Sequence, residues 1–232
     1  MYILGIDTSS NILTVTLTED KKLISENHTD RQMGLLENLA PTVENILSES
    51  SLEPKDLSAV AVSLGPGSFT GLRIGLSFGK ALAYTQNIPI IGIPTMKAMA
   101  YSAKSPFADL ICPMIHARAD EVYCAVFSGD MNEKIIDCTF MTVDELLSQD
   151  IFAGKKTVFM GTGALKYKNM IEEKLKDYTV MDEIYNFPRG LCINSLAYDE
   201  LARGKSDNIK TLVPMYIKKP TPVIRKEKGI IP

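Results

Sequence analysis

Histidine is scarce in this chain of 232 residues, since only His28 and His116 occur and they lie far apart in the sequence. Neither a His-x-x-x-His nor a His-Glu-x-x-His spacing is present, whereas a catalytic metal site needs clustered ligands. The four cysteines are scattered as well, without a Cys-x-x-Cys pair. Such scattering favours reduced thiols over a disulfide framework or a zinc site. We therefore expect no metal-dependent activity.

Long apolar runs are also missing, and none approaches the roughly 20 residues that a membrane-spanning helix needs. Residues 1–3 lead directly into the first apolar stretch, without the basic segment and cleavage site of a secretory signal. The composition, 45% hydrophobic and 23% charged, is that of an ordinary globular protein. We expect a cytoplasmic protein that makes no membrane contact.

An excess of positive charge is absent too. The formal net charge is −3, whereas a protein that binds nucleic acid on its own is usually basic. Basic residues concentrate only near the C-terminus, at Lys218, Lys219, Arg225, Lys226 and Lys228. Two interpretations of this tail stay open: a solvated charged segment, or a contact with an anionic partner.

Motifs for nucleophilic and phosphate chemistry fail on their spacing. Ser68 does not stand in a Gly-x-Ser-x-Gly elbow, so serine-nucleophile chemistry has no support. Residues 75–81 read Gly-x-x-x-Gly-Lys-Ala, one residue shorter than a Walker A loop and without its magnesium-binding hydroxyl. Gly65, Gly67 and Gly71 likewise miss the Gly-x-Gly-x-x-Gly spacing of dinucleotide-binding proteins by one residue.

The most informative stretch is residues 65–75, which read Gly-Pro-Gly-Ser-Phe-Thr-Gly-Leu-Arg-Ile-Gly. It lies between an apolar run at 59–64 that predicts a buried strand and a longer run at 72–84 that predicts a helix. A glycine-rich turn in this position presents backbone N–H groups, which can hold an anion or a partner's backbone.

Small residues continue into the predicted helix. Gly71, Gly75, Gly79 and Ala83 recur every four residues and therefore share one helix face. Because a glycine inside a helix costs about 1 kcal/mol relative to alanine, this glycine row indicates that another backbone approaches closely. That backbone could belong to a partner molecule or to this chain's own sheet, and we favour the partner.

Hydrophobic periodicity predicts an α/β protein of two lobes, with mixed central sheets flanked by helices. The first lobe, residues 1–104, has the order βββαβαβα. The second and smaller lobe, residues 105–232, opens with the same succession of strand, polar turn, strand, turn and strand, a weak internal duplication. Strands are predicted at residues 2–7, 13–18, 23–28, 59–64, 88–93, 110–115, 122–127, 134–138 and 157–160. Helices are predicted at residues 34–49, 72–84, 167–176 and 192–203, with short ones from Thr95 and Thr142. The helix at 192–203 could pack back on the first lobe.

Two polar turns could contact a nucleotide. Asp7, Thr8 and Ser9 stand at the tip of the first predicted hairpin, where they could face phosphates or a magnesium ion. Gly161, Thr162 and Gly163 end a predicted strand and could approach a nucleoside. The alternative interpretations are a plain polar hairpin tip and a plain strand-to-helix turn, since such turns are common.

The duplicated lobes, opening with Gly-Ile-Asp-Thr-Ser at residues 5–9, resemble the actin/hexokinase/Hsp70 ATPase superfamily, whose lobes are ribonuclease-H-like. Within it, residues 65–75 resemble the signature of the bacterial TsaB family, also called YeaZ. Further agreement lies at residues 3–9, 89–95 and 117–123 and in Pro214-x-Tyr216. The resemblance covers nearly the whole chain.

This resemblance implies a role in the biosynthesis of threonylcarbamoyladenosine in tRNA. TsaB proteins serve as non-catalytic partners of a catalytic relative, TsaD, whose metal-binding histidines they lack. The two form a heterodimer, to which the ATPase TsaE and tRNA add. The assembly transfers a threonylcarbamoyl group to the adenosine beside the anticodon. This chain would then require no cofactor, with at most weak ATP or ADP binding at the two polar turns.

The TsaB–TsaD contact uses helices of the first lobe, which match residues 34–49 and 72–84 here. The expected interface residues are Leu36, Leu39, Val43, Gly71, Leu72, Gly75, Leu76, Gly79, Lys80 and Ala83. Because an exposed apolar helix pair must be covered when the partner is absent, we also expect a homodimer through the same helices.

The chain departs from the family at two places. Leu35 and Leu36 precede Glu37, where the family often carries His and Ser, so the first helix is more apolar here. His116 stands in place of the aspartate of the family's Asp-Ala-Arg turn, which removes a carboxylate from the cleft between the lobes.

Two other functions compete with this interpretation. An ATP-dependent kinase or ATPase of the same superfamily would need Asp7 and a second cleft carboxylate to hold magnesium, and His116 occupies the expected place of the second. A metallopeptidase, a label sometimes attached to the broader family, would need the paired histidines that the chain lacks.

Overall fold

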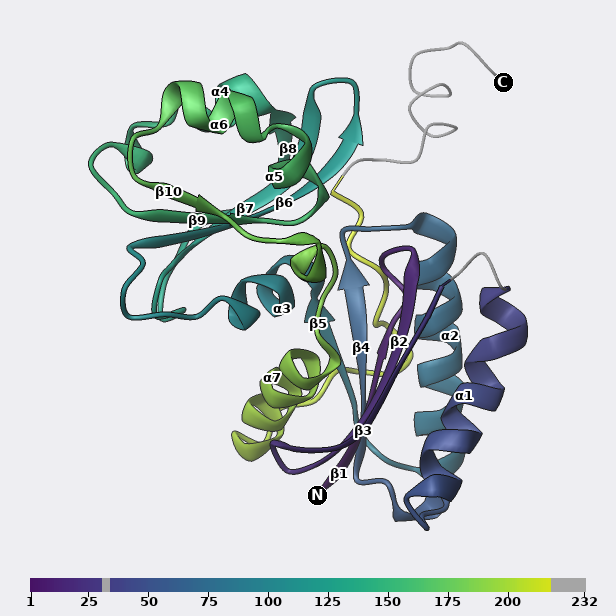
Figure 1. The fold of residues 1–232 in the computed structure, drawn as a ribbon. Coiled ribbons are helices and arrows are strands. Elements are labelled where there is room, and N and C mark those ends of the chain that lie inside the picture. Colours follow the sequence, from purple (N-terminus) through teal and green to yellow (C-terminus); the bar gives the residue numbers. More distant parts are fainter. Residues whose placement is uncertain (31–33, 218–232) are drawn as a thin grey trace.

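The computed structural model of this chain describes residues 1–30 and 34–217, apart from the side chain of Leu36. The side chain of this predicted interface residue and the basic residues from Lys218 onward lie outside what the structure describes. Within the described residues, the strands form two five-stranded sheets of mixed direction, flanked by helices (Figure 1). The predicted α/β class with two mixed sheets is confirmed.

The first sheet joins an antiparallel meander to two parallel strands. Its strands are β1 (Tyr2–Asp7), β2 (Ile12–Glu19), β3 (Lys22–Asp30), β4 (Ala59–Gly65) and β5 (Ile90–Pro94). Their order in the sheet is β3-β2-β1-β4-β5. β1 runs antiparallel to β2 and parallel to β4, so the central strand β1 and its neighbour β4 come from segments more than 50 residues apart.

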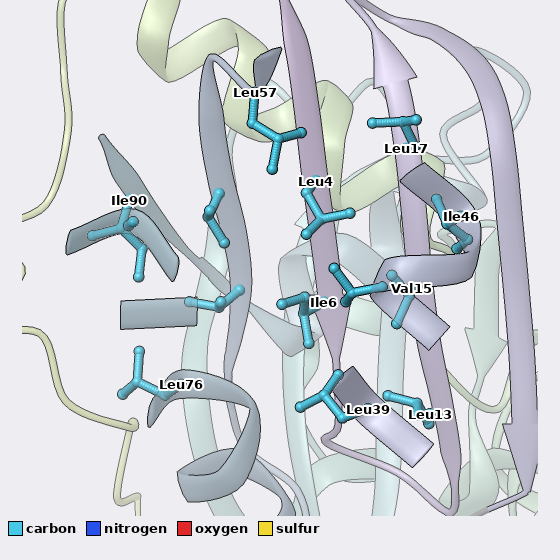
Figure 2. Packing of buried hydrophobic residues seen from close by; sticks show 14 of the residues in the cluster. Leu4, Ile6, Leu13, Val15, Leu17, Leu39, Ile46, Leu57, Leu76 and Ile90 are labelled. Carbon is cyan, nitrogen blue, oxygen red and sulfur yellow. The ribbon is translucent and has the colours of Figure 1, made fainter. Parts of the chain in front are cut away.

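Two helices, α1 (Leu35–Glu49) and α2 (Phe69–Gln86), cover one face of this sheet. Figure 2 shows Leu39 and Ile46 of α1 and Leu76 of α2 among the leucine, isoleucine and valine side chains of the strands. The core of the first lobe therefore lies between this helix pair and the sheet, as the apolar stripe of the predicted helix 34–49 indicates.

The glycine row of α2 packs on this chain's own sheet, which contradicts the predicted partner-facing role. A Cβ added to Gly79 would lie 2.5 Å from Cγ1 of Val62 in β4, and one added to Gly75 would overlap the side chain of Thr8. At these two positions of α2, an added side chain would overlap the side chains of β4 and of the loop after β1. Of the predicted interface residues, those buried inside the chain itself are Leu39, Val43, Gly71, Leu72, Gly75, Leu76, Gly79 and Ala83.

The second sheet repeats the layout of the first. Its strands are β6 (Leu110–Arg118), β7 (Glu121–Ser128), β8 (Lys134–Thr142), β9 (Thr157–Met160) and β10 (Tyr178–Val180), in the order β10-β9-β6-β7-β8. β6 runs antiparallel to β7 and parallel to β9, as β1 does to β2 and β4. The predicted internal duplication is therefore present in the topology.

Short helices accompany the second sheet. They are α3 (Thr95–Ser102), which also contacts the first sheet, α4 (Val143–Leu147), α5 (Thr162–Lys166) and α6 (Lys168–Lys174). The predicted helix 167–176 corresponds to α6. The sequence pattern missed α5 and β10, since five and three residues are too few to show a period.

The helix α7 (Gly190–Ala202) covers the face of the first sheet opposite α1 and α2 (Figure 1). The side-chain amide of Asn194 donates to the backbone oxygens of Ile3 and Thr16, at 2.9 and 3.2 Å, and to the hydroxyl of Thr18. The alternating threonines of β2 are consequently buried. The predicted half-buried character of this strand is wrong, because a helix from the far end of the chain covers its polar side.

The last described segment fastens the edge of the first sheet. The amide of Asp207 donates to the carbonyl of Ile90 at 3.0 Å, and that of Met215 donates to the carbonyl of Leu64 at 2.8 Å. Tyr216 then reaches the first turn of α2, where it accepts a hydrogen bond from Arg73. In the described part of the chain, no helix combines the length and the apolar character needed to cross a membrane.

Candidate functional site

A cavity of about 570 Å³ lies between the two sheets and receives residues from both predicted polar turns. The first lobe supplies the loop after β1 and the turn before α2, and the second lobe supplies strand ends and the start of α5. The described residues that line it are Ser9, Ser10, Asn11, Gly67, Ser68, Ile115, His116, Ala117, Arg118, Tyr123, Phe140, Thr162, Asn186 and Pro188. We call it the interlobe cavity.

Only part of the first polar turn reaches this cavity. Asp7 lies behind the wall, fully buried, where its Oδ1 accepts hydrogen bonds from the amide of Ser9 and the hydroxyl of Ser63. Thr8 is equally buried and donates to the carbonyl of Gly71 at 2.8 Å, which ties the loop to α2. Asp7 and Thr8 therefore hold the loop in place, and Ser9 is the member of the trio that faces the cavity.

The second polar turn likewise reaches the cavity with only one of its three residues. Thr162 lines the cavity, and its hydroxyl accepts a hydrogen bond from the amide of His116 at 3.1 Å. Gly161 and Gly163 lie against Met114: a Cβ added to Gly161 would overlap the Met114 carbonyl oxygen, and one added to Gly163 would lie a tight 3.0 Å from the Met114 Cβ. The structure thus brings Ser9 and Thr162 to one cavity from turns about 150 residues apart, and leaves the two glycines as close-packing positions of the second lobe.

His116 has its two ring nitrogens occupied within the second lobe. Its Nε2 lies 2.9 Å from Nζ of Lys166, and its Nδ1 lies 3.2 Å from the hydroxyl of Tyr167. Burial and then the nearby Lys166 ammonium lower the pKa of His116. Because the ammonium can only donate, the network assigns a neutral imidazole that accepts at Nε2 and carries its proton on Nδ1. His116 thus supports the wall of the cavity as a neutral side chain and supplies no negative charge there.

The other histidine serves a structural contact on the first sheet. His28 Nδ1 lies 3.0 Å from the hydroxyl of Thr14, and its Nε2 lies 3.1 Å from a carboxylate oxygen of Glu26. Among the described residues, no group of three or more His, Cys, Asp or Glu side chains could hold a metal ion.

The outward sides of α1 and α2 form a second candidate site, which we call the outer helix face. On α2 it contains the exposed Arg73, Ser77, Ala81 and Tyr84 and the half-buried Ile74 and Phe78, and on α1 the exposed Ala40, Pro41 and Glu44. Tyr84 is 74% exposed, an unusual value for a large aromatic side chain. Lys80 is the predicted interface residue of α2 that keeps partial exposure.

Sequence reasoning missed most of these candidate positions. Ile74 and Phe78 are four residues apart, as successive glycines of the row are, and they therefore share a different side of α2. This spacing could have indicated, from the sequence alone, a second apolar side of the helix. No local pattern pointed to Phe140 or Asn186, because only the packing of the two lobes brings them to the cavity. Arg118 and Tyr123 belong to residues 117–123, which resemble the family, but their pattern assigned them no role at the site.

Comparison with known proteins adds a consistent set of matches. The family model described as "TsaD: tRNA N6-adenosine threonylcarbamoyltransferase" matches residues 28–220. The tRNA threonylcarbamoyladenosine biosynthesis protein TsaB of Bacillus subtilis (strain 168) is 32% identical over 180 residues, which cover 75% of this chain and 77% of that protein. The protein of the same name from Escherichia coli (strain K12) is 36% identical over 139 residues, 57% of each chain.

A solved structure extends the likeness to the fold. It is described as an uncharacterized protein with similarity to peptidase YEAZ from Pseudomonas aeruginosa, and it superposes with a TM-score of 0.79 at 23% identity, covering 94% of this chain and 99% of that one. Together with the duplicated mixed sheets, this match shows that the two proteins share a two-lobed α/β fold. The chain belongs to the family that the TsaD model describes, and within it to the TsaB (YeaZ) proteins.

Proposed function

We propose that this chain is the non-catalytic partner subunit of a TsaD-type threonylcarbamoyltransferase in the biosynthesis of threonylcarbamoyladenosine in tRNA. The names of its curated relatives support the pathway. One observation carries the partner role: α1 and α2 lie side by side on the first sheet, and no described helix or strand covers the outer helix face, although Tyr216 contacts Arg73 at one end of it (Figure 1).

The side chains of the outer helix face suit a helical partner. Ser77 and Ala81 are small and exposed, and they stand beside the half-buried Ile74 and Phe78. Small side chains let a second helix approach to the 8–10 Å axis separation of packed helices, and the apolar neighbours then lose their contact with water. The partner thus docks on the side of α2 opposite the glycine row, and the glycine row holds α2 rigidly on the sheet behind it.

The interlobe cavity supports a non-catalytic role. None of its described lining residues is acidic, so it offers no pair of carboxylates for a magnesium–ATP complex. The competing kinase or ATPase function therefore finds no support in this cavity. We propose that the chain needs no cofactor for docking, and that a TsaE-type ATPase and tRNA join through the complex with TsaD.

A substitution on the outer helix face tests the docking. Ala81→Arg places a long charged side chain at an exposed position of α2, where it leaves the core intact. We expect binding to the TsaD protein of the same organism to weaken about tenfold or more in calorimetric titration, because the helices can no longer approach. The reconstituted tRNA modification should fall in parallel.

The matched control is Ala202→Arg, at the exposed end of α7 on the opposite side of the first sheet. Both variants should keep the circular dichroism and melting temperature of the unmodified protein. Equal TsaD affinity of the Ala81→Arg variant and the unmodified chain would refute docking through this face. In the absence of TsaD, we propose a homodimer through the same face, so that Ala81→Arg should shift light scattering toward the monomer.

A further inference from the structure

We propose that Arg73 is the charged anchor of the outer helix face, and that it pairs with a carboxylate on a helix of the docking protein. This inference rests on the proposed function, because it specifies the chemistry of the partner at one end of the same surface. It also gives Phe69 and Tyr216 a positioning role, since these two aromatic side chains hold the Arg73 guanidinium in place.

The first observation is the fixed orientation of this guanidinium. Its carbon lies 3.8 Å from the ring centroid of Phe69, which precedes Arg73 by about one helical turn. Its Nε donates a hydrogen bond to the Tyr216 hydroxyl at 3.1 Å, and the centroids of the two aromatic rings lie 5.5 Å apart. An arginine held in this way loses little further side-chain freedom when it binds an acceptor. The Arg73 side chain is therefore preorganised for binding.

Tyr216 reaches this position from a distant part of the chain, 143 residues after Arg73. The residue before it is fastened to the first sheet, because the amide of Met215 donates to the carbonyl of Leu64 in β4 at 2.8 Å. Phe69 lies in the first turn of α2, which packs on β4. Both supports of the guanidinium thus belong to elements that the first sheet holds, and the sheet fixes where the charge of Arg73 lies on the surface.

The second observation is that the described chain leaves this charge unpaired. α2 contains no aspartate or glutamate, and none of the ion pairs among the described residues includes Arg73. Two other exposed arginines differ in this respect, since Arg118 pairs with Glu121 and Arg203 pairs with Glu200. Arg73 is therefore a rigidly held cation for which the described residues supply no counter-charge.

The third observation is the place of Arg73 on α2. Ser77 and Ala81 follow it at intervals of four residues, so the three side chains share one side of the helix. A helix that packs along Ser77 and Ala81 at an axis separation of about 8–10 Å also reaches Arg73 and removes water from its guanidinium. A charge that loses its water is costly unless it is paired. The docking protein must then supply the counter-charge.

The chemistry of this surface favours a carboxylate of a protein over a phosphate of a nucleic acid. Surfaces that bind nucleic acids are strongly positive, whereas Arg73 and Lys80 are the charged residues of α2. The half-buried Ile74 and Phe78 beside the row suit the apolar side chains of a protein helix. The planar fork of an arginine matches a carboxylate with two parallel hydrogen bonds, which also fixes the register of the partner helix on α2.

The test is a calorimetric titration of the full chain with the TsaD protein of the same organism, at several concentrations of sodium chloride. Arg73→Gln should weaken binding about tenfold or more, because it leaves the partner's carboxylate without its cation. It should also flatten the dependence of the affinity on salt, since salt screens the attraction between the two charges. Arg73→Lys keeps the charge without the planar fork and should recover only part of the affinity.

The matched control is Arg203→Gln, which removes the same charge from the exposed end of α7, on the opposite face of the first sheet. It should leave both the affinity and its salt dependence unchanged. Both glutamine variants should keep the circular dichroism spectrum of the unmodified chain, because the substituted side chains are exposed.

A double-mutant cycle tests the positioning role of Tyr216. Tyr216→Phe removes the acceptor of the Nε hydrogen bond and keeps the ring, and it should weaken TsaD binding by a smaller factor than Arg73→Gln. In the Arg73→Gln background the same substitution should have no further effect, because it acts through the guanidinium. An equal effect of Tyr216→Phe in both backgrounds would overturn the positioning role.

The proposal is overturned if Arg73→Gln binds TsaD as tightly as the unmodified chain, or if Arg73→Gln and Arg203→Gln have equal effects. It is also overturned if Arg73→Gln weakens the binding of tRNA to the isolated chain but not the binding of TsaD, since the acceptor would then be a phosphate. Ala81→Arg separates these outcomes from a failure of docking itself. If Ala81→Arg prevents binding and Arg73→Gln does not, the outer helix face is the docking surface and Arg73 is not its anchor.

Discussion

Replacing Gly75 with alanine tests directly what the glycine row of α2 is for. The added Cβ would lie 3.1 Å from Cγ2 and 3.2 Å from Cβ of Thr8, and closer still to the Thr8 hydroxyl oxygen. Carbon atoms in good contact are about 3.5–4.0 Å apart. Either α2 moves away from the sheet, or Thr8 rotates and gives up its hydrogen bond to the Gly71 carbonyl.

The expected loss of stability follows from three contributions. Forcing an extra carbon into a packed interior costs about 1–3 kcal/mol. Losing the buried hydrogen bond of Thr8 costs about 1–3 kcal/mol. Alanine in place of glycine returns about 1 kcal/mol of helix propensity. The free energy of unfolding should therefore fall by about 3 kcal/mol, which lowers the urea midpoint by roughly 1.5 M if the denaturant slope is about 2 kcal/mol per M.

Urea unfolding followed by circular dichroism measures this loss in the free energy of unfolding. Two further variants serve as a control and as a test of its cause. Ser77→Ala, at an exposed position of the same helix, should stay within about 0.5 kcal/mol of the unmodified chain. Adding Thr8→Ala to Gly75→Ala removes the clashing oxygen and should recover part of the loss, a positive coupling in the double-mutant cycle. The reasoning fails if Gly75→Ala is as stable as the unmodified chain but no longer binds TsaD, since the glycine row would then face the partner.

Three further predictions address other parts of the molecule. Asn194→Leu removes the hydrogen bonds that tie α7 to β1 and β2. It should lower the free energy of unfolding by about 1–3 kcal/mol in urea titrations. An unchanged urea midpoint would show that these bonds contribute nothing to stability. Burial raises the pKa of the Cys124 and Cys138 thiols to about 12, while unfolded thiols ionise near 8.5. The unfolded chain thus loses protons that the folded chain keeps, so stability should be full below about pH 8.5 and then fall as pH rises, by up to about 1.4 kcal/mol per thiol and pH unit, with a shallower fall after Cys138→Ala. Lys166→Met should raise the pKa of His116 in an NMR titration, because it removes the nearby positive charge, and an unchanged midpoint would leave burial as the sole cause.

Local sequence patterns were sufficient for most of the secondary structure. The strand at 157–160 and the helix at 34–49 were predicted almost as the structure has them, because an apolar run or a helical period is a property of neighbouring residues. The pattern failed for β2, whose alternating threonines predicted a solvent-facing side. α7, about 180 residues later, covers that side, and no window of local sequence contains this information.

Local sequence patterns likewise identified only part of the candidate site. Ser9 and Thr162 were recognisable as polar turn residues, but the sequence could not say that Asp7 turns inward while Ser9 faces a cavity. Arg118 and Asn186 became candidates only when the two lobes were placed together. Most of the predicted interface residues of α1 and α2 are buried against the chain's own sheet, and the outer helix face, for which docking stays a proposal, lies on the other side of these helices.

By itself, the sequence determined that one face of α2 carries no side chains and packs closely, since the spacing of Gly71, Gly75 and Gly79 places these residues on one helix face. Only the tertiary structure decided what this face packs against: the side chains of Thr8, in the loop after β1, and of Val62, in β4 of the chain's own sheet. The physical reason is that helical periodicity sets the direction of side chains relative to one another, whereas the burial of a face depends on long-range packing. The side of α2 that stays open to a partner is therefore known only after the core has formed.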